Sequence, residues 1–439
     1  MMHGLREPRL ADFRAVLLFG ILLSAPGPLR AEEQQSKASA TPPDIPALLK
    51  TASEALDRKD FAAAAKALEV VVREHSDMPA AWFNLGYAYS GLNQSEDAVR
   101  AYQRALQLQP ELFEAQLNLG ILLIQMKRAA EAVPYLEKAV SLKPQHTRAH
   151  LYCGRALNIS GQPDAAEKEF QEALKLDPSL AIGYFDLGQL YLGKKDFEKA
   201  LASFQKAAET DPQLAQAELG MALALEGLKR APEASAHFEK YLAAQPGDLE
   251  SRFHLARVYL QEGNNEKALE NLQTVYQGNP RAPGVTAALG DVCALLKRFA
   301  ESEKYYRLAV AETPNESDLH RALAQTLLDQ QKFPEAEAEF RAALNLDSRS
   351  REAANGLATS LYLQKRYPEA LPLFEQLSRA PDAPAGVFFV LATCYDHLRD
   401  LPSAIKNYER FLELSHGQSP DQEWQARERL KPLRRELRK

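Results

Sequence analysis

The sequence contains little of what catalysis or metal binding requires. Only 3 cysteines and 9 histidines occur among its 439 residues. A Walker-type phosphate loop and the patterns Gly-x-Gly-x-x-Gly, His-Glu-x-x-His and Gly-x-Ser-x-Gly are all absent. The nearest approach to a metal site is His146 with His150, which lacks a third ligand at a suitable spacing. The sequence therefore favours a protein that is not an enzyme and that holds no metal or cofactor.

The chain also lacks an excess of positive charge. Its 53 Lys and Arg residues against 59 Asp and Glu residues give a formal net charge of −6. A basic surface is the usual requirement for binding nucleic acid, so the overall charge gives no reason to expect a DNA or RNA partner. The hydrophobic fraction of 46% is ordinary for a folded protein in water.

The apolar run near the N-terminus is short. Residues 15–25 form a largely apolar stretch that follows three arginines. Such a stretch is typical of a secretory signal peptide and is too short to span a bilayer comfortably. We predict a signal peptide over residues 1–31, with cleavage after Ala31 because Pro26 disfavours cleavage after Ala25. An exported protein, periplasmic or secreted, is therefore expected, and an uncleaved N-terminal anchor is the alternative.

What the chain does contain is a period of 34 residues, repeated eleven times over residues 45–418. The eighth residue of every repeat is Gly or Ala, and the twentieth is Ala in ten repeats and Ser302 in the other. A larger side chain at the crossing of two packed helices would force their axes apart. We therefore predict that two helices cross closely at these two positions in every repeat.

Each repeat predicts a helix, a turn and a second helix. Apolar residues recur at helical spacing on both sides of a polar interruption, and Pro stands at position thirty-two of seven repeats, where it ends the second helix. Pro134 and Pro372 lie one turn inside second helices, which predicts a local kink or a late helix start. The three cysteines, Cys153, Cys293 and Cys394, occupy inward positions too far apart to pair, and are predicted to be buried free thiols.

One repeat shows the characteristic residues most clearly. It contains Trp82-Phe83-Asn84-Leu85-Gly86-Tyr87-Ala88-Tyr89, followed by Ala98, Tyr102, Ala105 and Pro110. This pattern resembles a tetratricopeptide repeat, and the resemblance extends over residues 45–418. It implies an all-α, right-handed superhelical solenoid of eleven helix-turn-helix repeats. It also implies that the first helices line a concave groove that binds an extended peptide or a partner's helix.

The resemblance places the groove at positions two, five, six, nine, twelve and thirteen of the first helices. Repeats two to five carry aromatic, amide and arginine side chains there, which suit a peptide ligand. The predicted groove residues are Phe83, Asn84, Tyr87, Asn118, Ile121, Arg148, Tyr152, Arg155, Asn158, Asp186 and Gln189. The alternative is that position five is partly core and that the polar residues only solvate the groove. A chaperone-tail clamp is not expected, because only Asn118 and Arg148 match its five residues.

The C-terminal segment, residues 419–439, is predicted to be a helix that caps the last repeat. Its apolar stripe consists of Trp424, Leu430, Leu433 and Leu437, and seven basic residues lie between positions 427 and 439. Docking of this basic helix on an anionic membrane or an acidic partner is the alternative. Pro432 is expected to interrupt a long helix there.

These segments account for the whole chain and leave no room for an enzymatic domain. Residues 32–44, between the signal peptide and the repeats, are polar and are predicted to form a flexible leader, which is hypothesised to occupy the groove in the resting state. We expect a non-catalytic scaffold or adaptor that binds a protein segment in an envelope or secretion-associated assembly. One alternative is a regulatory or substrate-presenting partner of a separately encoded glycosyltransferase or polysaccharide-synthesis enzyme. Another is self-association into a structural array.

Overall fold

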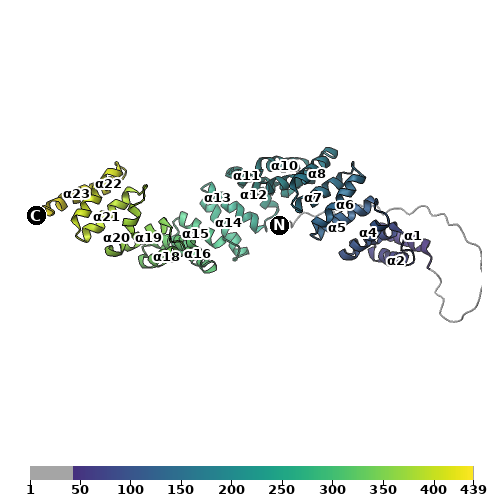
Figure 1. Ribbon diagram of the computed structural model, residues 1–439, viewed down its shortest axis with the longest axis horizontal. Helices are drawn as coiled ribbons and strands as arrows, with labels where there is room; N and C mark the ends of the chain where they lie inside the picture. The colour runs from purple at the N-terminus through teal and green to yellow at the C-terminus, as the bar shows by residue number, and fades with distance from the viewer. Residues whose placement is uncertain (1–42, 439) are drawn as a thin grey trace, which may run out of the picture. The chain divides into compact units, whose positions relative to one another are not determined.

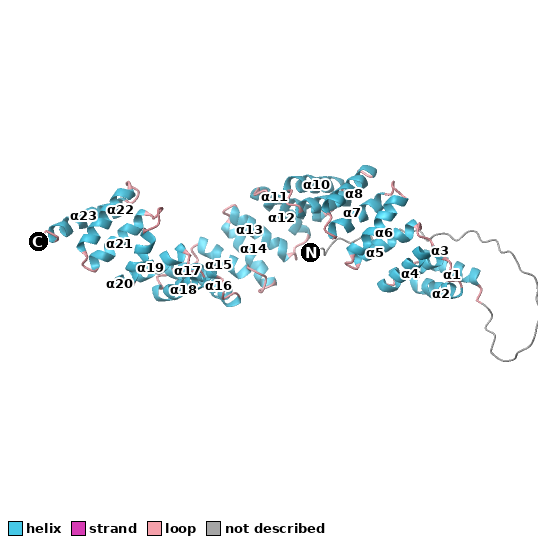
Figure 2. Ribbon diagram, viewed as in Figure 1, coloured by secondary structure: helices cyan, strands magenta, loops and turns pink. Residues whose placement is uncertain are grey.

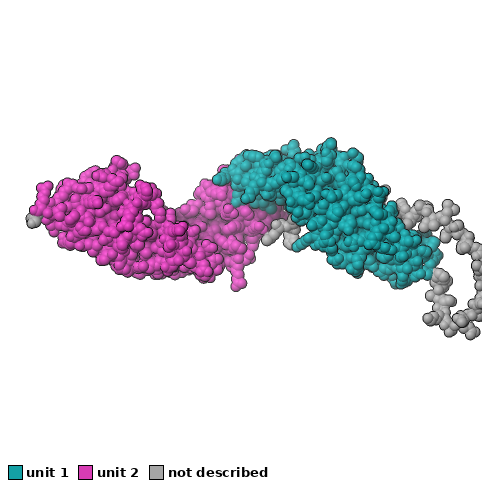
Figure 3. Space-filling model, in the orientation of Figure 1, with its two compact units in different colours: residues 1–230 teal, residues 231–439 magenta. Residues whose placement is uncertain are grey.

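The computed structural model describes residues 43–438, and these residues form 23 helices and no strand (Figures 1 and 2). The predicted signal peptide and nearly all of the predicted leader lie outside the described residues. The chain divides into two compact units, residues 1–230 and residues 231–439 (Figure 3). The division falls between α11 and α12, and each unit is a stack of antiparallel helix pairs.

Unit 1 contains eleven helices within its described residues. They are α1 (Ile45–Asp57), α2 (Phe61–Glu74), α3 (Pro79–Gly91), α4 (Ser95–Leu108), α5 (Phe113–Gln125), α6 (Ala129–Leu142), α7 (Thr147–Ile159), α8 (Pro163–Leu176), α9 (Ala181–Gly193), α10 (Phe197–Thr210) and α11 (Ala215–Gly227).

Unit 2 contains twelve helices within its described residues. They are α12 (Ala231–Ala244), α13 (Leu249–Gln261), α14 (Asn265–Gly278), α15 (Val285–Leu295), α16 (Phe299–Glu312), α17 (Ser317–Asp329), α18 (Phe333–Leu346), α19 (Arg351–Leu363), α20 (Tyr367–Ser378), α21 (Ala385–His397), α22 (Leu401–Ser415) and α23 (Pro420–Glu436).

The helices follow the 34-residue period closely. Every second helix of a repeat begins at position seventeen, and the first helices begin at position one in ten of the eleven repeats. The exception is α15, which begins two residues late at Val285 because Gly284 adopts a left-handed backbone with φ of 76°. Pro134 and Pro372 lie inside α6 and α20, which both begin on time, so the predicted late start is wrong at these two prolines.

The close helix crossing predicted from the small residues is confirmed. A Cβ atom placed on Gly154 would lie 2.7 Å from the ring of Phe170 on the second helix of the same repeat. The residues at position twenty are fully buried in all eleven repeats. Ser302, the one hydroxyl among them, donates a hydrogen bond to the carbonyl of Gly290 at 2.9 Å, so the exception leaves no unsatisfied polar group.

The turn between the two helices has the same conformation in every repeat. Position fifteen has a positive φ in all eleven, although only Gly161 and Gly263 among these residues are glycines. The next residue donates its N–H to the carbonyl five residues earlier, as Asp60 does to Ala55 at 2.8 Å. This is the Schellman arrangement, which satisfies the carbonyl groups left at the end of a helix and reverses the chain.

Histidine side chains connect successive repeats. The Nε2 atom of His150 lies 2.9 Å from the carbonyl oxygen of Pro144 at the end of the preceding repeat, and its Nδ1 atom lies 2.7 Å from Glu169. His320 makes the equivalent contacts with Pro314 and Glu339 in unit 2. His150 is therefore a structural residue between two repeats. Between residues 43 and 438 no cluster of three or more His, Cys, Asp or Glu side chains could hold a metal ion.

Tyrosine hydroxyls form a second kind of link between repeats. Tyr89 donates to Glu69 at 2.9 Å, and Tyr191 donates to Glu167 at 2.8 Å. Burial, together with the neighbouring carboxylate, raises the pKa of Tyr89 and that of Tyr191 to about 12. The folded protein therefore favours the neutral hydroxyl at a pH where a tyrosine in the unfolded chain, with a pKa near 10, is ionised.

The three cysteines are buried, as predicted. Burial raises the pKa of the Cys153 thiol and of the Cys394 thiol to about 12, and that of the Cys293 thiol to about 11. Thiols in this state behave as small apolar side chains and react poorly.

The C-terminal helix α23 packs on the last repeat through part of the predicted stripe. Leu430 and Leu433 are buried against Phe411 and Tyr408, whereas Trp424 is 65% exposed and Leu437 is 51% exposed. The stripe prediction was thus correct for only two of its four residues.

Two further properties of α23 bear on what the sequence suggested. The helix continues through Pro432, since the buried leucines on both sides of the proline hold it against repeat eleven. Two of its basic residues pair with acidic residues of the last repeat: Arg429 with Asp396 at 2.5 Å and Arg434 with Glu409 at 2.5 Å. These ion pairs favour a capping role over membrane docking.

The helix crossing makes a direct prediction for two glycines in first helices. Gly154→Val should lower the free energy of unfolding by about 1–3 kcal/mol, because the new methyl groups overlap the ring of Phe170. Gly193→Val is the matched control, because no atom lies within 4 Å of a Cβ placed there. Urea unfolding followed by circular dichroism measures both variants. Equal stability of the two would show that the crossing is not close.

The tyrosine links predict a loss of stability at alkaline pH. Because the pKa of Tyr89 and of Tyr191 is raised in the folded state, their contribution is complete below about pH 10 and is lost as the pH rises towards 12. At pH 8 the double variant Tyr89→Phe, Tyr191→Phe should be less stable than the unchanged protein, by about 0.5–1.5 kcal/mol for each lost hydrogen bond. Between pH 9 and 11 it should lose less stability than the unchanged protein does.

The control for this measurement is Tyr184→Phe, since the Tyr184 hydroxyl has no hydrogen-bond partner among the described residues. Thermal unfolding at pH 8, 9, 10 and 11 compares the three proteins. A double variant with the same pH profile as the control would contradict the account of these links.

Candidate functional site

We define the first-helix face as positions two, five, six, nine, twelve and thirteen of the first helices. The apolar and aromatic residues predicted for binding in unit 1 are largely enclosed on this face. Phe83, Tyr87, Ile121 and Tyr152 are all buried. The ring centre of Phe83 lies 5.8 Å from that of Tyr102. This contact agrees with the alternative interpretation, in which position five is partly core. Whether any of the four contacts a ligand stays a prediction.

Asparagine occupies position six in two successive repeats, the second and the third. Asn84 and Asn118 are both buried, and Asn118 is 0% exposed. The amide oxygen of Asn84 and both polar atoms of the Asn118 amide have no hydrogen-bond partner among the described residues. A buried amide without a partner costs about 1–3 kcal/mol, so these groups would gain from a ligand's backbone. Neighbouring side chains would have to move before a peptide could reach them.

The charged residues predicted for unit 1 form a cluster between repeats four and five. Arg155 donates through Nε to Asp186 at 2.6 Å, and the guanidinium of Arg155 lies 5.1 Å from the ring centre of Tyr152. The guanidinium of Arg148 lies 5.9 Å from the same ring. Asp186 already takes up part of the hydrogen-bonding capacity of Arg155. Less of the Arg155 guanidinium is therefore left for a bidentate contact with a ligand carboxylate.

The remaining predicted residues are more accessible. Gln189 is exposed and Asn158 is half-buried. The structure does not bring them into the Arg155 cluster through any hydrogen bond among the described residues. Ile159, next to Asn158 at position thirteen, is one of the exposed large apolar residues of the chain.

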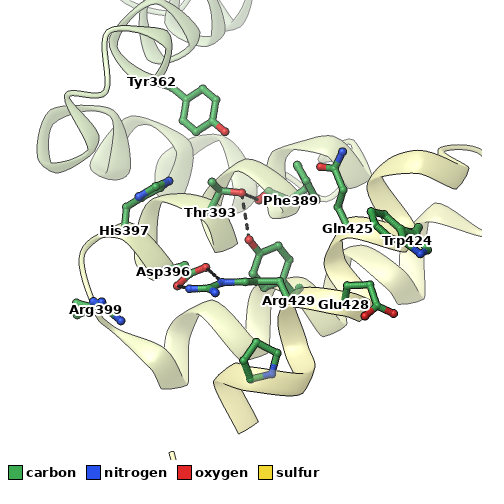
Figure 4. A pocket seen from close by; sticks show the side chains of 12 residues that line it. Tyr362, Phe389, Thr393, Asp396, His397, Arg399, Trp424, Gln425, Glu428 and Arg429 are labelled. Carbon is green, nitrogen blue, oxygen red and sulfur yellow. Dashed lines mark hydrogen bonds and ion pairs between the residues drawn. The ribbon is translucent and has the colours of Figure 1, made fainter. Parts of the chain in front are cut away.

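Unit 2 contains a cavity of about 710 Å³ that the sequence did not suggest (Figure 4). We call it the aromatic cavity. Its lining residues come from α19, α21, α22 and α23, and they are Tyr362, Phe389, Thr393, Asp396, His397, Arg399, Tyr408, Trp424, Gln425, Glu428, Arg429 and Pro432.

The repeat register explains why these residues meet. Phe389, Thr393, Asp396 and His397 occupy positions five, nine, twelve and thirteen of repeat eleven, all on the first-helix face. Counting on by 34 residues makes α23 the first helix of a twelfth repeat, with the fully buried Ala426 at its small eighth position. Trp424 then falls at position six. Half of the residues that line the aromatic cavity thus belong to the first-helix face of three successive repeats.

The charges that line the aromatic cavity are largely compensated. Arg429 donates to both oxygens of Asp396, at 2.5 and 2.8 Å, and this contact raises the pKa of the Arg429 guanidinium. Glu428 pairs with Lys431 at 2.5 Å. Figure 4 shows the Asp396–Arg429 pair on one wall and Trp424 with Gln425 on another. The Trp424 and Gln425 side chains have no hydrogen-bond partner among residues 43–438.

A second cavity of unit 2 lies on the first-helix face of repeats seven and eight. It measures about 460 Å³ and we call it the small-residue cavity. Its floor includes Gly284, Ala287 and Ala288, because α15 begins late and carries alanine at positions five and six. Phe253 and Leu260 form apolar walls, and Arg257 and Asp291 add one charge of each sign. An apolar side chain of a ligand would fit such a site.

The exposed apolar residues add to this picture. Ile159, Leu295 and Leu363 all occupy position thirteen of a first helix, and Leu295 is 60% exposed. Exposed apolar side chains along one face are typical of a protein interaction surface. The first-helix face therefore combines cavities with accessible apolar residues in unit 2.

The repeats can now be compared with known families. Models of the tetratricopeptide repeat match residues 79–112, 123–182, 227–275 and 259–326, and also residues 154–215, 185–249 and 321–384. Together these stretches cover well over half of the chain. The chain belongs to the tetratricopeptide repeat family. No curated protein matches its sequence.

Solved tetratricopeptide structures resemble parts of this chain. MamA from Desulfovibrio magneticus is 25% identical and covers 40% of this chain and 99% of its own, with a TM-score of 0.38. YrrB, described as a TPR protein with an unusual peptide-binding site, is 25% identical to this chain. The match covers 42% of this chain and 92% of YrrB, with a TM-score of 0.38. The C-terminal part of a TPR repeat-containing protein from Cytophaga hutchinsonii is 16% identical. That match covers 55% of this chain and 98% of the solved one, with a TM-score of 0.46.

Family membership establishes the general role of the chain. Tetratricopeptide repeats typically act as non-catalytic scaffolds for protein–protein interaction, and the repeats of this chain support a scaffold of that kind. No helix among residues 43–438 is both long and apolar enough to cross a membrane.

Sequence reasoning missed both cavities of this tetratricopeptide repeat chain. The signal for the aromatic cavity was Ala426, which lies 34 residues after the small eighth residue of repeat eleven. This register places Trp424 at position six, which is one of the predicted groove positions. The signal for the small-residue cavity was Ala287, at position five, where every other repeat carries a larger side chain, next to Ala288 at position six. Both signals are weak until the fold shows which residues face the same cavity.

Proposed function

We propose that this chain is an exported adaptor that binds an extended segment of a protein partner along the first-helix face of its repeats. The observation that carries the proposal is the position of the two cavities of unit 2. Both are lined by residues from the first-helix positions of neighbouring repeats. A ligand that runs from repeat to repeat would meet both an aromatic and an apolar site.

The first-helix face of unit 1 carries polar groups. The amides of Asn84 and Asn118 would pair with a peptide backbone once the side chains that enclose them have moved, and Gln189 is accessible. The first-helix face of unit 2 offers mainly apolar contact, and that of unit 1 offers mainly hydrogen bonding. Large apolar contacts usually contribute most of the affinity at protein interfaces.

The proposed export rests on residues 1–31, whose three arginines and short apolar run are typical of a secretory signal. An adaptor outside the cytoplasm would serve an envelope or secretion-associated assembly. A partner that proves to be a glycosyltransferase or polysaccharide-synthesis enzyme would narrow the proposal to the regulation of that enzyme.

Photo-crosslinking in the native host tests the proposed surface. A photoreactive residue at Gln189 in unit 1 or at Gln261 in unit 2 should give a covalent adduct with a partner protein, since both side chains are exposed on the first-helix face. The matched controls are Lys168 and Glu270, which are exposed on second helices of the same two units and should give no adduct.

Mass spectrometry of the adducts decides the result. Adducts at the controls and none at Gln189 or Gln261 would move the binding surface to the second helices. The cross-linked chain should also be recovered outside the cytoplasm with Glu32 as its first residue, and an N-terminus at Met1 in the cytoplasmic fraction would contradict the proposed export.

A further inference from the structure

The aromatic cavity has a chemistry that specifies its ligand more closely than the general proposal does. We propose that it binds a proline-rich segment of the partner protein in the polyproline II conformation. This inference rests on the proposed function, because it names the class of segment that the first-helix face takes at the C-terminal end.

Aromatic rings cover the walls of the aromatic cavity. Tyr362, Phe389, Tyr408 and Trp424 line it, and Trp424 is 65% exposed although it is one of only two tryptophans in the chain. Prolyl rings pack well against flat aromatic surfaces, and grooves of Trp and Tyr are the usual binding sites for polyproline II segments. A large, accessible Trp beside other rings is the arrangement that such a ligand requires.

The unpaired polar groups of the cavity include N–H donors. The indole N–H of Trp424 and the amide of Gln425 have no partner among the described residues, and His397 is fixed by stacking on Tyr367 at 4.3 Å with no hydrogen bond to its ring nitrogens there. A polyproline II segment offers carbonyl oxygens that point outward and no N–H at its prolines. Its acceptors therefore match the donors of the cavity.

The charge balance favours a neutral ligand. The carboxylate of Asp396 is occupied by Arg429, and Glu428 is paired with Lys431. An oligosaccharide would be the other neutral ligand for aromatic walls, but its hydroxyl groups need free acceptors as well as donors. The two carboxylates that line the cavity are already engaged, which leaves fewer acceptors for a sugar and favours the peptide.

The test is the binding of a fluorescein-labelled decaproline to the full-length chain, measured by fluorescence anisotropy. Decaproline should bind, and a Gly-Ser peptide of the same length should not. Trp424→Ala should weaken the binding of decaproline by about tenfold or more, since a central Trp usually dominates such a contact. Gln425→Ala should weaken it less, because one neutral hydrogen bond is lost.

Leu437→Ala is the matched control, because Leu437 follows α23 directly, is 51% exposed and does not line the cavity. It should leave the affinity unchanged. Circular dichroism should show all three variants to be folded, since none removes a buried side chain. No binding of decaproline, equal binding by Trp424→Ala, or displacement of decaproline by a hexasaccharide would overturn the proposal.

This outcome can be separated from that of the proposed function. Adducts from Gln189 and Gln261 without any binding of decaproline would leave the scaffold role intact and reject only the proline-rich ligand. Binding of decaproline that depends on Trp424, without adducts at Gln189 or Gln261, would support the ligand class and confine the binding surface to the C-terminal repeats.

Discussion

The close contact between a small residue on the first helix and a bulky residue on the second is the constraint on which the rest of the structure depends. The ring of Phe204 shows how tight it is, because it lies against Gly188 of its own repeat and Gly220 of the next, at distances of 2.7 and 2.5 Å from a Cβ placed on either glycine. A Leu, Phe or Tyr stands at position twenty-four of every repeat. Since the same contact recurs, each helix pair is set at a similar distance from the next within its unit. The first helices then present the same positions on one face, repeat after repeat.

The binding properties follow from small departures from this regularity. Where the first-helix face carries bulky residues, as in repeats two to four, the side chains pack on one another and enclose Asn84 and Asn118. Where it carries Gly284, Ala287 and Ala288, the late start of α15 and the missing side-chain volume leave a cavity. In α23, which continues the repeat register, Trp424 is exposed beside repeat eleven. The scaffold is thus uniform in its packing and varied on its binding face.

Much of the fold could be predicted from the sequence because it depends on residues close together in the repeat. The helix boundaries, the small residues at the crossing and the burial of the cysteines all follow from the 34-residue period and from helical spacing. The cavities could not be predicted in this way, since their residues come from two or three successive repeats. The same holds for the pairing of Arg155 with Asp186, which lie 31 residues apart, and for the continuity of α23 through Pro432. These features depend on which neighbours fill the space around a residue, and a single repeat does not contain that information.

The central claim is that protein segments bind to the first-helix face, and hydroxyl-radical footprinting of the chain with and without its captured partner tests it most directly. Leu295 and Leu346 are a suitable pair, because both are exposed leucines of unit 2, at 60% and 43%, and they lie on a first and a second helix respectively. The account predicts that the partner protects Leu295 and Trp424 from oxidation and leaves Leu346 unchanged. Protection of Leu346 with no change at Leu295 or Trp424 would contradict it.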